Sequence, residues 1–241
     1  MIADCRRRKA LSFGLIRFVI TCVVLLTVTV IPAGASKLTA KEILKKAGRH
    51  YDVIKDYVAD AKVTVESPSL HVPEMRAKIY YKKPDKLHLE SQDGFAVLPR
   101  EGALVGNPLR ELMASPDLMI GRDERVLDDD CYVIKGSFQR ENRDVQSTVW
   151  IDKKNWLVRQ LHGNPEWGPS AKVKIWYARL AGRYWLPAKT VAQLSLPPLP
   201  GEETEGKSEP KQQTIVTVEF TNYRVNIGLD DKIFRRQEGD K

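Results

Sequence analysis

The feature that most constrains the fold is a two-residue alternation of apolar and polar side chains that begins near residue 57. One stretch places apolar residues at every second position, namely Tyr57, Ala59, Ala61, Val63 and Val65. Successive side chains of a strand point to opposite faces, so this pattern predicts a β-strand with one buried face. The pattern returns over 75–82 and 87–90, with the turn Lys83-Pro84-Asp85-Lys86 between them. The sequence therefore predicts an antiparallel sheet that buries one side.

The same reasoning extends the sheet along most of the chain. Further strands are expected over 95–98, 131–138, 145–152, 156–161, 171–180, 184–194 and 214–225. Lys153-Lys154-Asn155 and Ala181-Gly182-Arg183 have the composition of hairpin turns. Residues 195–213 contain four prolines and four glutamates and few apolar residues, so this segment is expected to be a long mobile loop inside a hairpin.

A one-sided sheet needs an apolar cover, and two segments predict helices that would supply it. Thr39 and Glu42 have the spacing of a capping box, and they open an amphipathic helix that is expected to end near Ile54. Asn107-Pro108 predicts the start of a short helix that crosses the sheet. The expected fold class is α+β, mainly β, with a single curved antiparallel sheet and a helical lid. One domain is expected to span residues 36–241.

Residues 1–35 predict a secretory signal peptide. A basic segment at Arg6–Lys9 precedes the apolar run 18–31, and Ala33-Gly34-Ala35 follows as a cleavage site before Ser36. Such a leader predicts a periplasmic protein. The alternative is an uncleaved membrane anchor, because the run 18–35 approaches the length of a transmembrane helix.

Charge and catalytic motifs argue against two classes of function. The formal charge is +8, and residues 1–35 hold five basic residues against one acidic residue, which leaves a mildly basic body. No stripe of Lys and Arg alternates with aromatic residues, so no nucleic-acid partner is expected. The histidines lack the close spacing of metal ligands, and Cys131 follows three aspartates that disfavour a thiolate. The sequence predicts no catalytic residue, no metal and no cofactor, although an enzyme site assembled only in space stays open.

Several short motifs, taken in order, resemble one known family. The motifs are Tyr57–Val63, Tyr80–Leu87, Trp150–Lys153, Gly182–Pro187 and Phe220–Phe234. Together they resemble the LolA/LolB-like family of bacterial outer-membrane lipoprotein carriers, across most of the chain after the leader. The last of them is the most diagnostic.

The resemblance implies an incomplete antiparallel β-barrel whose open side is plugged by helices. It also implies a cavity that binds acyl chains of lipoproteins or lipids, which a periplasmic carrier would help deliver to the outer membrane with inner-membrane or outer-membrane machinery as partners. No cofactor and no reaction are implied. Two alternatives stay open: a periplasmic sensor that binds lipoproteins or lipids to regulate envelope-stress signalling, and a lipid-acting hydrolase.

The strand alternation predicts which side chains would line such a cavity. Side chains at alternate positions share a face, so the uncharged set points inward. The predicted cavity residues are Ala61, Val63, Val65, Ala77, Ile79, Tyr81, Leu87, Leu89, Phe95 and Val97, with Leu112 and Met113 on the side of the lid. The alternative is that several of them form ordinary core.

We expect the leader to be removed before Ser36. N-terminal sequencing of the protein recovered from its native host should begin at Ser36, because the small residues before it form the cleavage site. Recovery of an intact Met1 in the membrane fraction would show instead that the leader is a retained anchor.

Overall fold

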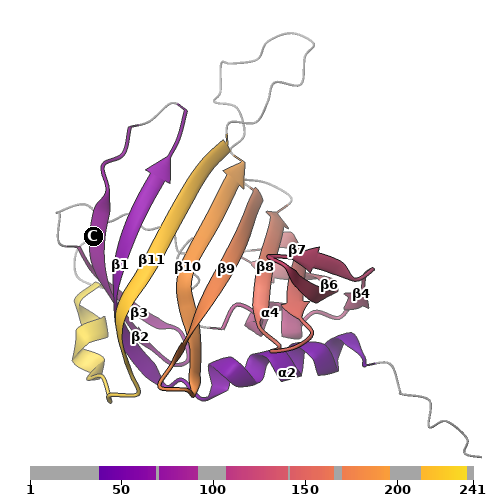
Figure 1. Cartoon of the computed structure of the whole chain (residues 1–241), viewed down its shortest axis with the longest axis horizontal. Coiled ribbons are helices and arrows are strands. Elements are labelled where there is room, and N and C mark those ends of the chain that lie inside the picture. The colour runs from indigo at the N-terminus through magenta and orange to yellow at the C-terminus, as the bar shows by residue number, and fades with distance from the viewer. Residues whose placement is uncertain are drawn as a thin grey trace, which may run out of the picture. The chain divides into compact units, whose positions relative to one another are not determined.

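The alternating segments form one antiparallel β-sheet in the computed structural model of the chain (Figure 1). The structure describes residues 38–68, 71–91, 107–140, 142–165, 170–195 and 213–237. The strands are β1 (Asp56–Glu66), β2 (Met75–Lys82), β3 (Lys86–Ser91), β4 (Met119–Ile120), β5 (Glu124–Val126), β6 (Asp129–Arg140), β7 (Arg143–Asp152), β8 (Val158–Pro165), β9 (Ser170–Leu180), β10 (Tyr184–Ser195) and β11 (Gln213–Val225). The helices are α2 (Ala40–Asp52), α4 (Arg110–Met113) and the 3₁₀ helix η1 (Asp231–Gln237). All of these elements lie in the compact unit Leu38–Lys241.

The sheet is open and curved. Neighbouring strands follow the order β3-β2-β1-β11-β10-β9-β8-β7-β6-β4, and β5 also pairs with β6. Two meanders, β1 to β3 and β6 to β11, are joined by the antiparallel pairing of β1 with β11. The prediction of a mainly β fold with a single curved antiparallel sheet is confirmed. The strand order ends at β3 and β4, so the described sheet does not close into a barrel.

The predicted alternation sets the register of the sheet. Ala61 pairs with both Ala77 and Phe220, and Val63 pairs with Val218, so apolar residues of adjacent strands share one face. Three register shifts interrupt this regularity in the described pairs, between Val58 and Asp60 where β1 pairs with β11, between Trp150 and Ile151 where β7 pairs with β8, and between Pro187 and Lys189 where β10 pairs with β9. Bulges bend a strand and increase its local twist, which favours the curvature of the sheet.

Helix α2 begins at the predicted capping box. The Thr39 hydroxyl accepts a hydrogen bond from the Glu42 amide (3.3 Å), and the Glu42 carboxylate accepts one from the Thr39 amide (2.8 Å). The Thr39 amide, and after it the Thr39 hydroxyl (2.9 Å), donate to the Glu42 carboxylate and hold its pKa below the usual value. Ile43, Leu44 and Ala47 are buried on one side of the helix, which lies along the lower end of the sheet in Figure 1.

Some predicted boundaries differ from the structure. Asn107 was expected to cap a helix, but its side chain accepts the Leu109 amide (3.0 Å) in a turn, and α4 begins only at Arg110. Strand β8 begins at Val158 rather than 156 because the Asp152 carboxylate accepts the amides of Lys154 and Asn155, which extends the preceding turn. The short elements β4, β5 and η1 were not predicted, since two to seven residues are too few for a periodic pattern.

Two predicted segments lie outside the described residues. These are the strand expected over 95–98 and almost all of the loop expected over 195–213. The two strands that border this loop, β10 and β11, do form the predicted antiparallel pair. Within the described part of the chain, no helix is long and apolar enough to cross a membrane.

The apolar face of the sheet carries two neighbouring clusters of buried residues. We call this the inner face, because α2 packs on it. One cluster joins α2 and α4 to the strands of one half, through Ile43, Leu44, Leu112, Ile134, Val149 and Ile175. The other lies on β1, β2, β11 and β10, and includes Ile79, Val63, Val218 and Ala192. The opposite, outer face is mostly polar, with a small cluster around Cys131, Val133 and Trp150.

A latch at the end of β11 fixes the C-terminal segment to β1. The buried Asp56 carboxylate accepts hydrogen bonds from the amides of Ile227 (2.8 Å) and Gly228 (3.1 Å). Gly228 has a φ of +76°, a left-handed conformation that favours glycine. Farther along, Asp231 forms ion pairs with Lys82 (2.7 Å) and Lys86 (3.0 Å), which hold η1 beside β2 and β3. These two ion pairs lower the pKa of Asp231 to about 2.

We predict that Ile79→Ala lowers the free energy of unfolding by about 2–5 kcal/mol, because it removes buried methyl groups and leaves a cavity. The Ile79 side chain is fully buried at the centre of its cluster. Val53→Ala is the control, since Val53 is 43% exposed and should change the stability by about 0.5 kcal/mol or less. Urea denaturation of both variants checks this, and equal stability of the two would contradict the assigned core.

Candidate functional site

The inner face changes character from the end near α2 to the opposite end. One row of directly paired residues crosses the sheet through Val65, Val216, Ala192, Val173, Leu161, Val149 and Ile134. Most of this row is buried. The next row, farther from α2, consists of Thr214, Leu194, Ala171, Gly163, Ser147 and Gly136. This second row has small side chains and is mostly half-buried.

We call the half-buried part of this region the open strip, defined by Ser147, Leu161, Gly163, Ala171 and Leu194. These residues lie on the four adjacent strands β7 to β10: Ala171 and Leu194 lie at the ends of β9 and β10, and Ser147, Leu161 and Gly163 lie within β7 and β8. Their side chains are apolar or small, and Ser147 alone among them carries a polar group. The open strip is therefore an apolar surface that the described residues cover only in part.

Gly163 marks open space at the centre of the strip. A Cβ atom built on Gly163 would have no heavy atom within 4 Å, apart from Gly163 itself and its two chain neighbours. Gly136 in the same row is the opposite case. A Cβ there would lie 2.8 Å from Ser115 Oγ and 3.0 Å from Leu112 Cδ1. The row is thus sealed at β6 by the segment around α4 and is open at β8.

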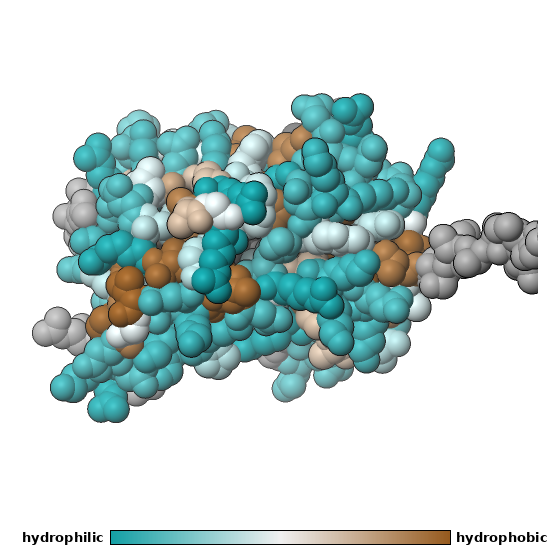
Figure 2. Space-filling model, turned by 60° about the horizontal axis from the view of Figure 1, so that its bottom comes forward, coloured by the Kyte–Doolittle hydropathy of each residue, from teal (hydrophilic) through white to brown (hydrophobic). Residues whose placement is uncertain are grey.

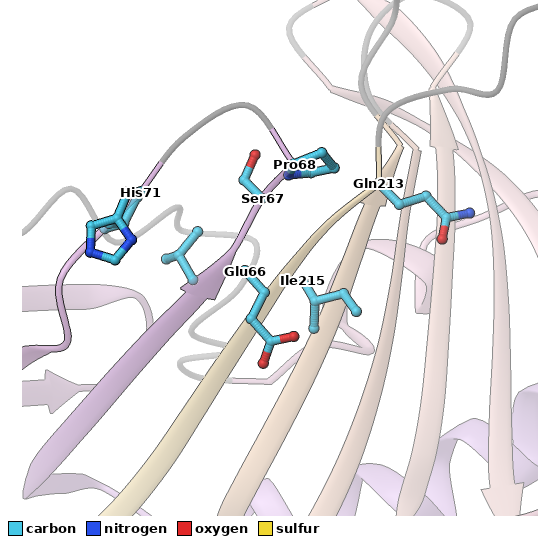
Figure 3. Close-up of a pocket in the computed structure, with 8 residues that line it drawn as sticks. Glu66, Ser67, Pro68, His71, Gln213 and Ile215 are labelled. Carbon is cyan, nitrogen blue, oxygen red and sulfur yellow. The ribbon is translucent and has the colours of Figure 1, made fainter.

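The other end of this row adjoins a hollow at the rim of the sheet (Figure 3). The hollow has a volume of about 460 Å³ and is lined by Val65, Glu66, Ser67, Pro68, His71, Val72, Gln213 and Ile215. Figure 3 shows Glu66 and Ile215 side by side on the ends of β1 and β11, with His71 on the segment that returns past them. The Thr214 hydroxyl donates to Ser67 (3.3 Å), so the row and the hollow share a border with polar groups.

The predicted cavity residues separate into three groups. Ala61, Val63, Ala77, Ile79 and Tyr81 are at most 4% exposed, and Val65, Leu87 and Leu89 pack half-buried against them in the same cluster. Leu112 and Met113 belong to the other cluster, where Leu112 covers Gly136 and Met113 approaches Gly48. Phe95 and Val97 lie outside the described residues. The structure thus brings eight of the twelve together on one half of the inner face.

The residues of the open strip were missed by the analysis of the sequence. Ser147, Gly163 and Ala171 carry little hydrophobicity, so they do not stand out in an alternating pattern. One signal was present, because an isolated glycine within a strand often marks a close approach by a ligand or another backbone. Gly163 fits that rule, whereas Gly136 fits the alternative that a neighbouring segment of the chain fills the space.

Tyrosine rings pack in both clusters, with Tyr57, Tyr81 and Tyr223 in one and Tyr51 and Tyr177 in the other. The rings of Tyr57 and Tyr81 lie 5.1 Å apart, and Tyr57 and Tyr223 lie 5.5 Å apart. The Tyr223 hydroxyl donates to the Pro187 carbonyl (2.8 Å), and the hydroxyls of Tyr51 and Tyr177 are 2.8 Å apart. Burial raises the pKa of Tyr57 and of Tyr223, and it raises that of Tyr51 to about 12. These phenols stay protonated near neutral pH, and the hydroxyls of Tyr51, Tyr177 and Tyr223 are hydrogen-bonded.

The titratable groups do not form a catalytic arrangement in the described part of the chain. Burial, followed by the charge of Asp152, raises the pKa of Cys131 to about 11, so its thiol is a poor nucleophile. Nε2 of His50 lies 2.7 Å from the Asn155 carbonyl in a structural contact. Burial lowers the pKa of His162, and the nearby Lys172 lowers it further. The described residues contain no group of three or more His, Cys, Asp or Glu side chains that would hold a metal ion.

Comparisons with solved structures identify the fold. A LolA superfamily protein from Nitrosomonas europaea aligns with 83% of this chain and 99% of its own, with a TM-score of 0.53 and 12% identity. A DUF1329 family protein from Desulfovibrio piger covers 83% and 98%, with a TM-score of 0.54 and 14% identity. A domain assigned to outer-membrane lipoprotein sorting, from Vibrio parahaemolyticus, covers 83% and 99%, with a TM-score of 0.52 and 13% identity.

No family model and no curated protein matches the sequence of the chain. At these identities the three structures show a shared fold, and the chain has the LolA-like fold that its motifs predicted. A shared fold does not establish that this chain binds the same ligands as those proteins.

The contrast between the two glycines predicts opposite effects on stability. Gly163→Ala should leave the free energy of unfolding unchanged or raise it by up to about 1 kcal/mol, because the new methyl group meets open space and alanine has less backbone entropy to lose. Gly136→Ala should lower it by about 1–3 kcal/mol through overpacking against Leu112 and Ser115. Thermal and urea unfolding of the two variants measures the difference. Destabilisation by Gly163→Ala equal to that by Gly136→Ala would show that the strip is filled.

Proposed function

We propose that the chain is an exported carrier that holds an acyl chain of a lipoprotein or lipid on the inner face of its sheet, at the open strip. The observation that carries this proposal is the open space beside Gly163 within an apolar surface on β7 to β10. Apolar area left uncovered on a sheet face is unfavourable in water, and an acyl chain would cover it at a gain of about 0.8 kcal/mol per buried methylene group. The LolA-like fold supports the same reading.

The proposed site also includes the half-buried members of the predicted cavity. Val65, Leu87 and Leu89 are half-buried rather than sealed in the core, and a long bound chain would reach them by extending from β10 across β11, β1 and β2 to β3. The fully buried Ala61, Val63, Ala77, Ile79 and Tyr81 would form the floor beneath it. Ala61 and Ala77 pair directly, and their small side chains would leave room above them for the bound chain. Leu112 would close the strip at its β6 end.

The proposal places the protein in the periplasm after loss of residues 1–35. Its partners would be the acylated cargo and the inner-membrane or outer-membrane machinery that supplies or receives it. Binding and release without covalent change would account for the absence of an activated nucleophile among the described residues, and no reaction is part of the proposal. The described geometry favours neither the hydrolase nor the sensor, so both enter only as results of the test.

We predict that Gly163→Leu weakens the binding of a dansyl-labelled fatty acid at least tenfold. The leucine side chain would occupy the open space and displace several methylene groups of the ligand, each worth about 0.8 kcal/mol. Gly163→Ala should have a small effect. Leu89→Glu should abolish binding with the sheet retained, because it places a charge among the half-buried residues of the site. Fluorescence titration and far-ultraviolet circular dichroism measure binding and fold.

Thr148→Leu is the matched control. Thr148 follows Ser147, the β7 residue that pairs with Gly163, and its side chain points to the outer face. The added leucine should therefore leave binding unchanged. Intact acyl species that co-purify with the wild type, detected by native mass spectrometry, are also expected. Wild-type affinity in Gly163→Leu would overturn the assignment of the strip. Time-dependent cleavage of the acyl ester would indicate the hydrolase, and a stable complex with a membrane-bound signalling protein would indicate the sensor.

A further inference from the structure

The end of the sheet opposite the open strip carries exposed apolar side chains. Val53, just after α2, is 43% exposed, and Ile227, just after β11, is 46% exposed. Asn226 connects them, because its side-chain amide donates to the Val53 carbonyl (3.0 Å) and approaches the Tyr184 hydroxyl (3.3 Å). Figure 2 shows this end of the molecule, where apolar residues gather in patches among hydrophilic ones.

The turn between β9 and β10 adds aromatic and cationic groups to the same surface. Ala181 and Gly182 both have positive φ, which makes a tight two-residue turn. On either side of the turn the Arg183 guanidinium lies 5.2 Å from the Tyr184 ring, and the Arg179 guanidinium lies 5.7 Å from the Trp185 ring. We call the group formed by Val53, Arg179, Arg183, Tyr184, Trp185 and Ile227 the basal patch.

The charges at the basal patch are of one sign. Both arginines are exposed, and so is Lys55, whose backbone amide donates to the side chain of Asn226 (2.7 Å). Of the carboxylates next to these segments in the chain, Asp52 pairs with Lys83 (3.4 Å), Asp56 is buried against the amides of Ile227 and Gly228, and Asp230 is exposed and accepts the Lys232 amide (2.9 Å). The outward charge of this end is therefore positive and complements an anionic surface.

We propose that the basal patch docks the protein on an anionic lipid bilayer. Two exposed aliphatic side chains, a half-buried tyrosine and a half-buried tryptophan stand beside exposed arginines, and this combination matches the layered polarity of a membrane interface, where aromatic rings sit at the headgroups and cations reach the phosphates. Exposed apolar groups would gain nothing against a nucleic-acid backbone. The patch has few basic residues, so its attraction to the bilayer is weak and reversible.

The proposal does not rest on acyl binding, because the basal patch and the open strip lie at opposite ends of the strands (Figure 1). A chain docked through the basal patch would hold the open strip away from the bilayer. The strip would then face a soluble partner or cargo rather than the lipid on which the protein rests. The variant Gly163→Leu should therefore bind vesicles as the wild type does.

The test uses the chain that begins at Ser36, which contains every described element, and vesicles of phosphatidylcholine with or without phosphatidylglycerol. The wild type should co-sediment with the anionic vesicles and much less with the neutral ones, and added salt should weaken the binding. Arg179→Glu with Arg183→Glu should reduce the affinity at least tenfold. The matched control is Lys172→Glu with Lys174→Glu on the outer face of β9, where the same charge change should reduce it less than threefold.

Two further measurements separate insertion from simple charge attraction. The tryptophan emission should shift to shorter wavelength on addition of anionic vesicles, and Trp185→Phe should remove the shift. Val53→Ser with Ile227→Ser should weaken binding without changing its dependence on salt. Circular dichroism confirms the fold of each variant, and the milder Arg183→Gln replaces any charge reversal that fails to fold. Equal binding to neutral and anionic vesicles, wild-type affinity in the arginine variant, or binding only to an acidic polypeptide such as polyglutamate would overturn the proposal.

Discussion

The rest of the structure depends on one requirement, which is that the apolar face of a wide sheet has to be removed from water. The helix available for this is short. With 13 residues, α2 has a length of about 20 Å, whereas ten strands side by side at about 4.8 Å spacing span more than twice that distance. Curvature brings the two halves of the sheet toward each other, and this buries part of the apolar face that α2 is too short to cover. The open strip is the part of the face that the helices and the curvature leave half-covered.

This requirement explains why the two ends of the sheet differ. Near α2 the helix and the buried tyrosines fill the inner face, and polar groups there are paired, as in the Asp56 latch. Toward the opposite end the side chains on the inner face become smaller. The strands extend beyond the helix there, and these side chains are partly exposed to solvent. A sheet covered at one end and open at the other is a suitable geometry for a binding protein, because the covered end maintains the shape while the open end stays accessible.

The sequence predicted the features that depend on residues close together in the chain, and it did not predict those that depend on residues far apart. Alternation over Tyr57–Val65 and the capping box of Thr39 and Glu42 are local, so the strands of the two meanders and helix α2 were predicted with errors of a few residues. The pairing of Ala61 with Phe220 and the latch between Asp56 and Gly228 join residues far apart in the chain, and no local pattern encodes them. The open strip exists because no described side chain packs over Gly163. That is a property of the whole fold, and a sequence motif does not report it.

The pairing of β1 with β11 has a consequence for how the chain acquires its structure. β1 and β11 are the first and last strands along the chain, and they are neighbours in the interior of the sheet. β1 therefore lacks one of its two partners until the end of the polypeptide is available. Closing a loop of this length carries an entropic penalty that local contacts do not offset, and contacts between distant residues slow folding. The first meander is therefore unable to complete its sheet while the C-terminal part is still being made. Under the proposed export of the chain, such a delay would keep the polypeptide unfolded during its passage, because its topology postpones the stable state until the last strand has arrived.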